Sequence, residues 1–215
     1  MAIVLTNGNL SGKLKGLVYT SRNGITYVRI SGGPNKSRTS KQHNQRAKFQ
    51  ATSRFVGQIL EPIKIGWKDN NSQHFNKAVS YHFNNSIEAI DDESDTGKQE
   101  FLINIEKVLM AKGEMPPPVI TSLTRDNSEI CLEWETKLLD KKHRQSDSMI
   151  LAVWRPGSRA KVFIDLGNRA KGNARVLLPH EFQEPTHFWA FYRNMISESP
   201  KSELNVSNSV YLGEK

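Results

Sequence analysis

The sequence predicts an α+β protein in which an N-terminal β-hairpin and two helices precede a C-terminal seven-stranded antiparallel β-sandwich. Three observations lead to this fold. An Asn-Gly pair separates two β-branched runs near the start of the chain, apolar residues recur at helical spacing between residues 41 and 90, and seven short apolar runs follow Pro118. The 215 residues are enough for a hydrophobic core in one or two domains.

The N-terminal hairpin is predicted from residues 14–21 and 25–31, which are rich in β-branched and aromatic side chains. Asn23-Gly24 lies between these runs, and both residues tolerate the positive φ angles of a tight hairpin turn. Residues 2–6 are predicted to form a further short strand, and Ser11-Gly12 a turn. Because side chains alternate along a strand, the second arm should have two faces, one with Ile25, Tyr27 and Arg29 and the other with Thr26, Val28 and Ile30.

Two helices are predicted after the hairpin, the first beginning near Lys41 and the second over residues 73–90. Pro62 is expected to end or kink the first, since it has no N–H to donate. The expected N-caps are Thr39 or Ser40 for the first helix and Ser72 for the second. The positions expected to be buried are Ala47, Phe49, Ala51, Phe55, Val56, Ile59, Leu60 and Ile63, then Phe75, Ala78, Val79, Phe83, Ile87 and Ile90.

The segment between the second helix and the sandwich contains several different local patterns. Residues 91–95 are an acidic stretch typical of a solvated loop, 101–111 favour a strand over a short helix, and 112–113 favour a turn. Pro116-Pro117-Pro118 is a stiff, extended linker and the predicted domain boundary. The predicted division is a basic hairpin and helical domain over 1–98, a strand and Pro-rich linker over 99–118, and a β-sandwich over 119–215.

Seven short apolar runs at regular spacing predict the strands of the sandwich. They cover residues 119–124, 129–135, 149–155, 160–166, 174–178, 186–192 and 209–213. In the second run Ile130, Leu132 and Trp134 alternate with more polar residues, which predicts one buried and one solvated face.

The positive charge is concentrated at one end of the chain. The sequence holds 30 Lys and Arg against 22 Asp and Glu, yet all ten basic residues before residue 61 stand without a single acid. Such asymmetry is typical of a basic end that meets an anionic partner, namely nucleic acid, an acidic protein surface or a membrane surface. The equally open alternative is a solvated basic face whose counter-charges lie elsewhere in the fold. The candidate polyanion-binding residues are Lys13, Lys15, Arg22, Arg29, Lys36, Arg38, Lys41, Arg46, Lys48 and Arg54.

Two tyrosines are interleaved with these cations. Tyr19 and Tyr27 lie in the glycine-rich hairpin beside Arg22 and Arg29. On a slim β-ribbon they can stack on bases while the cations hold phosphates. The alternative, which the pattern favours somewhat, is that they pack on the following helix.

Signatures of catalysis and of cofactors are scarce. The sequence has no phosphate-binding loop, no dinucleotide fingerprint, no H-E-x-x-H and no G-x-S-x-G. Its six histidines form no short ligand pair. Its single cysteine, Cys131, has Glu129 and Glu133 two residues away on either side and no histidine nearby to act as a base. We therefore expect neither an enzyme nor a bound metal or cofactor. Because no apolar run is long enough to cross a bilayer, we expect no membrane span.

Two resemblances add to this interpretation. Residues 116–213 resemble a fibronectin type III-like module, on the strength of Pro118, of Leu132-Glu133-Trp134 and of HFWAFYRN at 187–194. The resemblance is architectural and implies an immunoglobulin-like sandwich rather than an activity.

The whole chain is similar to an uncharacterised domain-of-unknown-function family common in Bacteroidota. The residues that carry this similarity are Ser11-Gly12-Lys13-Leu14, the YVR at 27–29, Arg38-Thr39, the QRAKF at 45–49 and Ser209-Val210-Tyr211-Leu212-Gly213. It implies no activity, and it makes a phage-linked or mobile-element role conceivable.

Two functions follow from these observations. The first is a cytoplasmic, non-enzymatic binding protein whose basic N-terminal region engages a polyanion, above all nucleic acid. The second is a structural or assembly protein of phage or mobile-element type, in which the N-terminal strands insert into a protein partner and the sandwich serves as a display module. In the second, the protein would be part of a homo- or hetero-oligomeric, virion-like assembly.

Overall fold

The computed structural model confirms the α+β fold class. It describes residues 2–4, 10–33, 39–67, 73–90, 99–137, 146–182, 185–195 and 204–215. Contacts divide the chain into two compact units, Met1–Thr39 and Ser40–Lys215, which we call the N-terminal unit and the main unit and describe separately.

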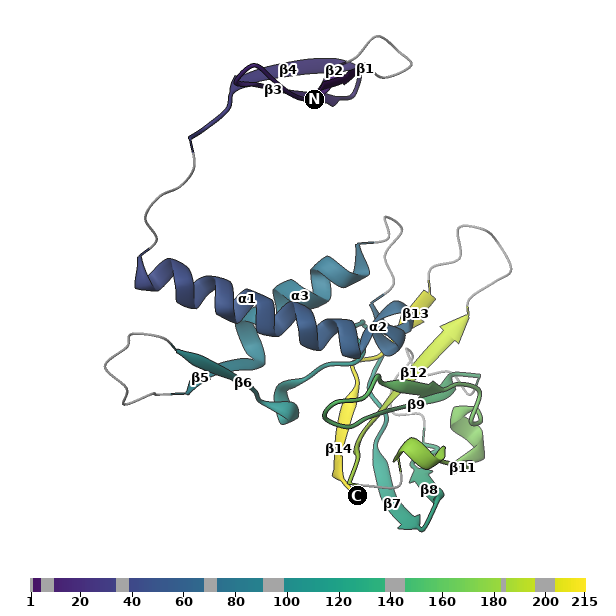
Figure 1. Cartoon of the computed structure of the whole chain (residues 1–215). Helices are drawn as coiled ribbons and strands as arrows, with labels where there is room; N and C mark the ends of the chain where they lie inside the picture. The colour runs from purple at the N-terminus through teal and green to yellow at the C-terminus, as the bar shows by residue number, and fades with distance from the viewer. Residues whose placement is uncertain are drawn as a thin grey trace. The chain divides into compact units, whose positions relative to one another are not determined.

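The N-terminal unit is a single antiparallel sheet with the strand order β1-β2-β3-β4 (Figure 1). Its strands are β1 (Ala2–Val4), β2 (Leu10–Leu14), β3 (Leu17–Arg22) and β4 (Ile25–Ile30). The predicted turn between β3 and β4 is confirmed, since Asn23 and Gly24 have φ angles of 53° and 78°.

A second tight turn in this sheet was not predicted. Lys15 and Gly16 have φ angles of 43° and 83°, so the strand expected over 14–21 begins at Leu17 instead. Gly12, expected in a turn, lies inside β2. A lysine with positive φ is uncommon, which is why the pattern did not indicate a turn at this place.

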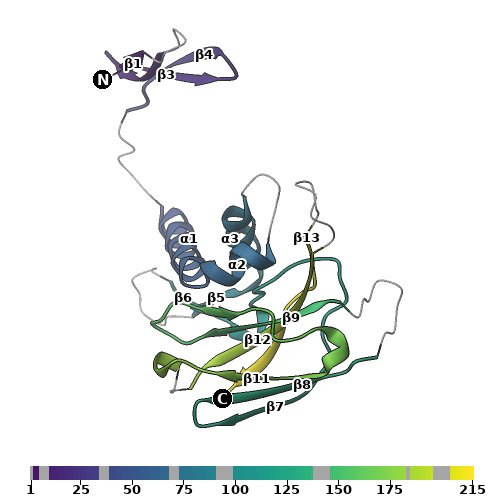
Figure 2. The same ribbon diagram turned by 90° about the vertical axis from the view of Figure 1, so that its right-hand side faces the viewer.

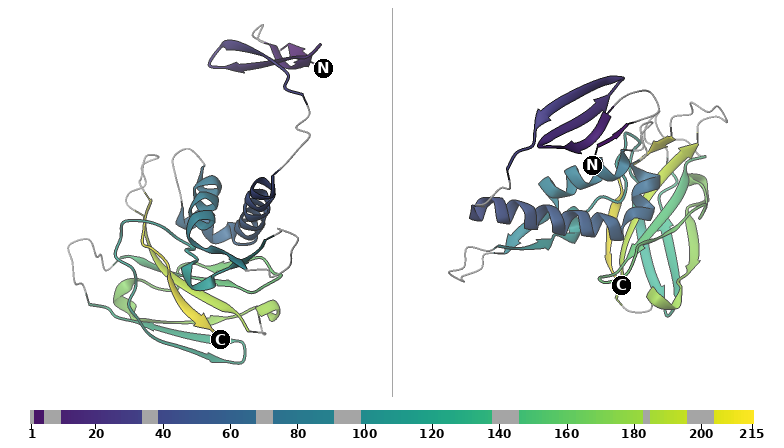
Figure 3. Two further views of the ribbon diagram at one scale, coloured as in Figure 1. Left: turned by 90° about the vertical axis from the view of Figure 1, so that its left-hand side faces the viewer. Right: turned by 45° about the horizontal axis from the view of Figure 1, so that its top comes forward.

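Three helices follow, α1 (Ser40–Gln58), α2 (Leu60–Gly66) and α3 (His74–Asn85), with α1 and α3 side by side (Figure 3). The predicted effect of Pro62 is confirmed: the first helix is interrupted at Ile59. Proline has no N–H for the carbonyl four residues earlier, and that carbonyl, of Gln58, instead accepts the N–H of Ala160 at 2.8 Å. The Gln58 carbonyl, left without a partner in the helix, therefore binds the sandwich.

The apolar stripe of α1 is buried only in its second half. Phe55 and Val56 are buried, as is Ile59 directly after the helix, but Phe49 is 56% exposed, which contradicts its expected burial. The first half of α1 extends beyond the core, so apolar side chains at the same helical spacing, such as Phe49, face solvent there.

The helix predicted over 73–90 is too long, and its expected cap, Ser72, lies outside the described residues. The Ser86 N–H closes the last turn on the His82 carbonyl, and Ser86 Oγ donates to the Lys107 carbonyl at 2.7 Å. The chain continues as β5 (Ile87–Ile90), which pairs with β6 (Glu100–Ile103). Ile87 is buried from this strand, whereas Ile90 is exposed, contrary to the prediction.

The segment after β6 combines both predicted possibilities. The strand ends at Ile103, the 3-10 turn η1 covers Ile105–Lys107, and the chain then runs extended through the core. Val108, Met110 and Ala111 are fully or almost fully buried there.

All seven predicted sandwich strands are present, together with a short additional one, β13 (Leu204–Val206). The seven are β7 (Ile120–Asp126), β8 (Glu129–Trp134), β9 (Ser148–Trp154), β10 (Lys161–Phe163), β11 (Asn173–Leu177), β12 (His187–Met195) and β14 (Val210–Glu214). Two 3-10 turns, η2 (Arg169–Lys171) and η3 (His180–Phe182), lie between them. One sheet has the order β11-β8-β7; in the other, β10-β9-β12 continues with β13 and β14 along the same edge of β12.

The β9–β12 sheet is covered on both faces, by the helices on one side and by β7, β8 and β11 on the other (Figure 2). Along β9, Met149, Leu151 and Val153 belong to the core between the sheets, while Ile150 and Trp154 belong to the core shared with the helices. This explains why β9 reads as an uninterrupted apolar run. In β8, the predicted buried face of Ile130, Leu132 and Trp134 is confirmed.

One core therefore joins both sides of the Pro116–Pro118 run. The Trp189 indole donates to the Val108 carbonyl at 3.1 Å, and the Ser209 hydroxyl accepts the Met110 N–H at 2.8 Å. The structure divides the chain at residues 39 and 40, not at the prolines. Independent folding of the predicted domains over 1–98 and 119–215 stays a prediction. Of the helices that the structure describes, none is long and apolar enough to cross a membrane.

Candidate nucleic-acid interface

The register of the N-terminal sheet sorts its side chains onto two faces. Residues directly opposite one another in neighbouring strands share a face, and the pairing gives the rows Lys13–Val18–Arg29 and Leu14–Leu17–Ile30. Since alternate residues along each strand also share a face, two rows are enough to assign the whole sheet. The predicted alternation along β4 is confirmed.

The first face, which we call the basic face, has five outer side chains around a central Val18, namely Lys13, Arg22, Ile25, Tyr27 and Arg29. Ser11 and Thr20 lie on the same face. All five outer side chains are exposed, and Tyr27 and Ile25 are 56% and 58% exposed. Lys13 and Arg29 flank β3, about 10 Å apart at two strand spacings, and Tyr27 lies about 7 Å along β4 from Arg29. No carboxylate can pair with these cations within the N-terminal unit, because the first acid of the chain is Glu61.

The opposite face, which we call the apolar face, bears no charged side chain among its described residues. It consists of Leu14, Leu17, Tyr19, Val28 and Ile30, with Gly12, Ser21 and Thr26. Ile30 is 81% exposed and Val28 53%. The hydroxyls of Ser21 and Thr26 lie 2.9 Å apart, as expected for a cross-strand pair on one face. The two tyrosines are thus separated: Tyr27 accompanies the cations and Tyr19 does not.

The remaining candidate cations lie elsewhere. Lys15 is exposed in the turn before β3, and Lys36 and Arg38 lie outside the described residues. The other four are on α1, in the main unit: Lys41, Arg46, Lys48 and Arg54.

The α1 cations do not form one uniform face. At about 100° per residue, Arg46 and Arg54 project about 80° apart, and both are exposed. Lys48 is half-buried, and its Nζ lies 4.7 Å from the centroid of the Phe83 ring. The ammonium group of Lys48 therefore makes a cation–π contact with the Phe83 ring of α3. Lys41 is exposed in the first turn of the helix.

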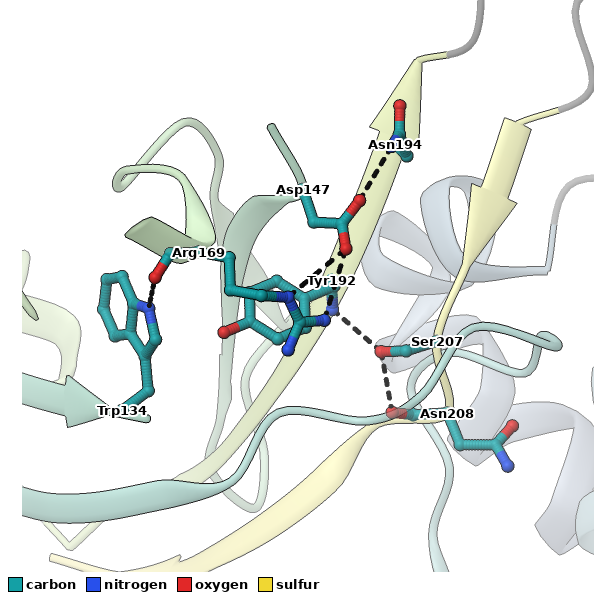
Figure 4. A network of polar contacts seen from close by, with 7 residues as sticks. All are labelled: Trp134, Asp147, Arg169, Tyr192, Asn194, Ser207 and Asn208. Atoms are coloured by element: carbon teal, nitrogen blue, oxygen red, sulfur yellow. Dashed lines mark hydrogen bonds and ion pairs between the residues drawn. The ribbon is translucent and has the colours of Figure 1, made fainter. Parts of the chain in front are cut away.

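A buried polar cluster connects η2 to β12 (Figure 4). Arg169 donates from Nε and Nη2 to Asp147 Oδ2, both at 3.3 Å, and Asn194 donates to Asp147 Oδ1 at 2.7 Å. The guanidinium carbon lies 3.8 Å from the Tyr192 ring centroid, and Trp134 Nε1 donates to the Arg169 carbonyl at 3.1 Å. Burial raises the pKa of Tyr192 to about 12, so its hydroxyl is neutral at physiological pH.

This cluster holds the sandwich together rather than forming an open site. The side chains of Asp147 and Arg169 are 0% and 3% exposed. Two opposite charges removed from water must satisfy each other, and here they tie the loop before β9 to the loop before β11. Sequence reasoning missed the cluster because its members are 22 and 47 residues apart, a separation that no local spacing reports.

A cleft of about 560 Å³ lies between α3 and residues 112–114. Trp67, Tyr81 and Lys112 line it, and Lys112 Nζ is 5.0 Å from the Tyr81 ring centroid and 5.8 Å from that of Trp67. The ammonium group of the chain itself therefore covers the aromatic faces. This leaves the cleft less suited to a ligand than the exposed tyrosine of the basic face.

The groups typical of metal sites and nucleophiles are dispersed. Among the residues that the structure describes, no three His, Cys, Asp or Glu side chains gather so that they could hold a metal ion. Cys131 is half-buried on β8, where its strand neighbours are Thr124 and Arg175.

The fold and the two faces of the N-terminal sheet define an α+β protein with two units. One unit is a small amphipathic β-sheet, and the other is larger and contains a β-sheet that is covered on both faces. The chain belongs to the family of unknown function DUF6266, whose model matches residues 9–213. The match reaches into both units, and it covers β2, β3 and β4 of the amphipathic sheet but not β1. No curated protein matches the chain.

Proposed function

We propose that this protein is a non-enzymatic binding protein whose basic face engages nucleic acid. The observation that carries the proposal is the placement of Lys13, Arg22 and Arg29 on one sheet face with the exposed Tyr27. Lysine and arginine neutralise phosphates, and an exposed aromatic ring stacks on an unpaired base. Single-stranded nucleic acid offers both groups, so it is the form we propose.

The test compares one charge reversal on the basic face with one elsewhere. Arg29→Glu should weaken binding of a fluorescently labelled single-stranded oligonucleotide at least tenfold in an anisotropy titration. Arg159→Glu makes the same change at an exposed arginine of the main unit and should leave the affinity within about twofold. Equal effects of the two variants would show that only net charge matters and would contradict a site on the sheet.

The polyanion need not be a nucleic acid. An acidic protein surface offers charge but no free base faces, so it would respond to Arg29→Glu and not to loss of the Tyr27 ring. Competition of the labelled oligonucleotide by an acidic polypeptide such as polyglutamate distinguishes the two: strong competition would favour the protein surface. Arg46 and Arg54 of α1 are the second set of candidate contacts, and their reversal tests that helix separately.

The second candidate function is that of a structural or assembly protein, which the exposed apolar face favours. A sheet face with Val28 and Ile30 open to solvent suits a protein partner better than a polyanion. In this alternative the sandwich is a display module. Its order of β11-β8-β7 opposite β10-β9-β12-β14 supports the fibronectin type III-like resemblance. Higher-order assembly in the absence of nucleic acid, measured by light scattering, would favour this function.

Each proposed function implies a cellular compartment, and the family resemblance implies an origin. For the binding protein we propose the cytoplasm, and for the assembly protein a virion-like particle. The Bacteroidota origin implied by the resemblance belongs with them as a prediction. Fractionation of a source organism, with nuclease treatment of the fraction that retains the protein, would separate the two compartments.

A further inference from the structure

We propose that the apolar face of the N-terminal sheet is a self-association surface, on which the same face of a second copy of this chain packs. The inference does not depend on what the basic face binds. It rests on three properties of the N-terminal unit: its size, its amphipathicity and the absence of any covalent or metal staple.

A unit of this size needs additional stabilisation. It spans 39 residues in a single sheet, and domains below about 40 residues generally depend on disulfides, metals or oligomerisation. Residues 1–39 contain no Cys, His, Asp or Glu, so neither a disulfide nor a conventional metal site can form within them. Association of two copies through the apolar face would supply such stabilisation as a second layer.

The charge distribution favours an identical copy as the occupant. The described residues of the apolar face bear no charge, so two such faces meet without like-charge contacts. An acidic partner would find no cation here, because Lys13, Arg22 and Arg29 all lie on the opposite face. In a face-to-face pair the sheets would lie about 10 Å apart with both basic faces outward, and at that distance salt screens their repulsion.

The area of the face sets the expected strength of association. The four strands contain 3, 5, 6 and 6 residues. At about 4.8 Å between strands and about 3.3 Å per residue, they give a footprint of roughly 300 Å² per copy. This is less than half of the roughly 800 Å² per partner of a standard interface. We therefore expect a reversible dimer that dissociates on dilution, with two outward basic faces for polyanion binding.

The test measures the mass of the full chain by sedimentation velocity over a wide range of concentration, in nuclease-treated samples. Val28→Glu places a charge on the apolar face, and Ile25→Glu places the same charge on the basic face of the same strand, at nearly equal exposure of 53% and 58%. We expect a concentration-dependent dimer for the wild type and for Ile25→Glu, and a monomer for Val28→Glu.

Two further measurements separate association from folding and from polyanion binding. Val28→Thr keeps a β-branched residue and should weaken dimerisation without abolishing it, and amide spectra of the hairpin report whether Val28→Glu remains folded. Val28→Glu should still bind an oligonucleotide as a monomer if the basic face does so, because Val28 lies on the other face. A wild type that is monomeric at every concentration, or a dimer that withstands Val28→Glu, would overturn the proposal.

Discussion

Removal of the Tyr27 ring and removal of the Arg29 charge should weaken nucleic-acid binding in two different ways. Both side chains lie on the basic face, separated by one residue of β4. An arginine acts through phosphate charge, which depends on salt, and a tyrosine through stacking, which depends on salt much less. The variants Arg29→Ala and Tyr27→Ala therefore test the two contributions separately, with Tyr27→Phe as the control that keeps a ring.

The expected magnitudes follow from the three cations of the basic face. Each neutralised phosphate of a single strand contributes about 0.7 to the slope of log K against log salt, which gives a slope of about −2. Between 50 and 200 mM salt the affinity should then fall about 20-fold. Arg29→Ala should reduce the slope to about −1.4 and the fall to about sevenfold. Tyr27→Ala should lose about 1–3 kcal/mol, or roughly five- to 150-fold in affinity, at an unchanged slope.

The assay is a series of anisotropy titrations with one labelled single strand at four or more salt concentrations. Tyr27→Phe should retain the wild-type affinity, since the ring and not the hydroxyl makes the contact. A wild-type slope near zero would refute the electrostatic part of the reasoning. A Tyr27→Ala variant that binds like the wild type, with Arg29→Ala impaired, would refute the stacking part and leave a purely electrostatic surface.

Three further predictions concern the main unit. Asp147→Ala leaves the buried guanidinium of Arg169 without its carboxylate and should lower the free energy of unfolding by about 3–5 kcal/mol; urea denaturation measures this, and a loss below about 1 kcal/mol would show that the pair is dispensable. Burial lowers the pKa of His82, so the unfolded chain binds a proton first as pH falls through 6.5. Stability should be greatest above that pH and decline below it by up to about 1.4 kcal/mol per pH unit. His82→Gln should reduce this decline, with a smaller remainder from His187, whose pKa burial also lowers. Gly57→Ala, at an exposed helical site with open space around it, should stabilise by about 0.5–1 kcal/mol, whereas Gly66→Ala would press on Ala111 and should lower the melting temperature.

The sequence was most informative where local geometry decides the structure. The Asn23-Gly24 turn and the alternation along β4 depend only on neighbouring residues, and both are confirmed. The sequence therefore predicted the part of the basic face that lies on β4. The part from β2 depends on the Lys15-Gly16 turn, which a lysine with positive φ concealed. Without that turn, Lys13 would not lie in the same cross-strand row as Arg29.

Contacts between distant residues account for the remaining differences. Ile87 and Ile90 continue the helical spacing of α3 but pair with Glu100–Ile103, a partner strand that no helical pattern reveals. The Pro116–Pro118 run indicates local stiffness and says nothing about which core its neighbours join. Asp147 and Arg169 are ordinary polar residues in sequence, and only the fold brings them into contact.

The path of the chain through the main unit has a consequence for folding order. Ser209 Oγ accepts the N–H of Met110 across a separation of 99 residues, and β13 and β14 cover one edge of β12. A nascent chain that has passed β12 but lacks residues 204–214 thus exposes one unpaired edge of β12 and an unfinished core, which favours aggregation. The hairpins of the N-terminal unit involve only near neighbours and can form much earlier. We therefore expect synthesis to present the amphipathic sheet to the cell before the main unit has completed its own core.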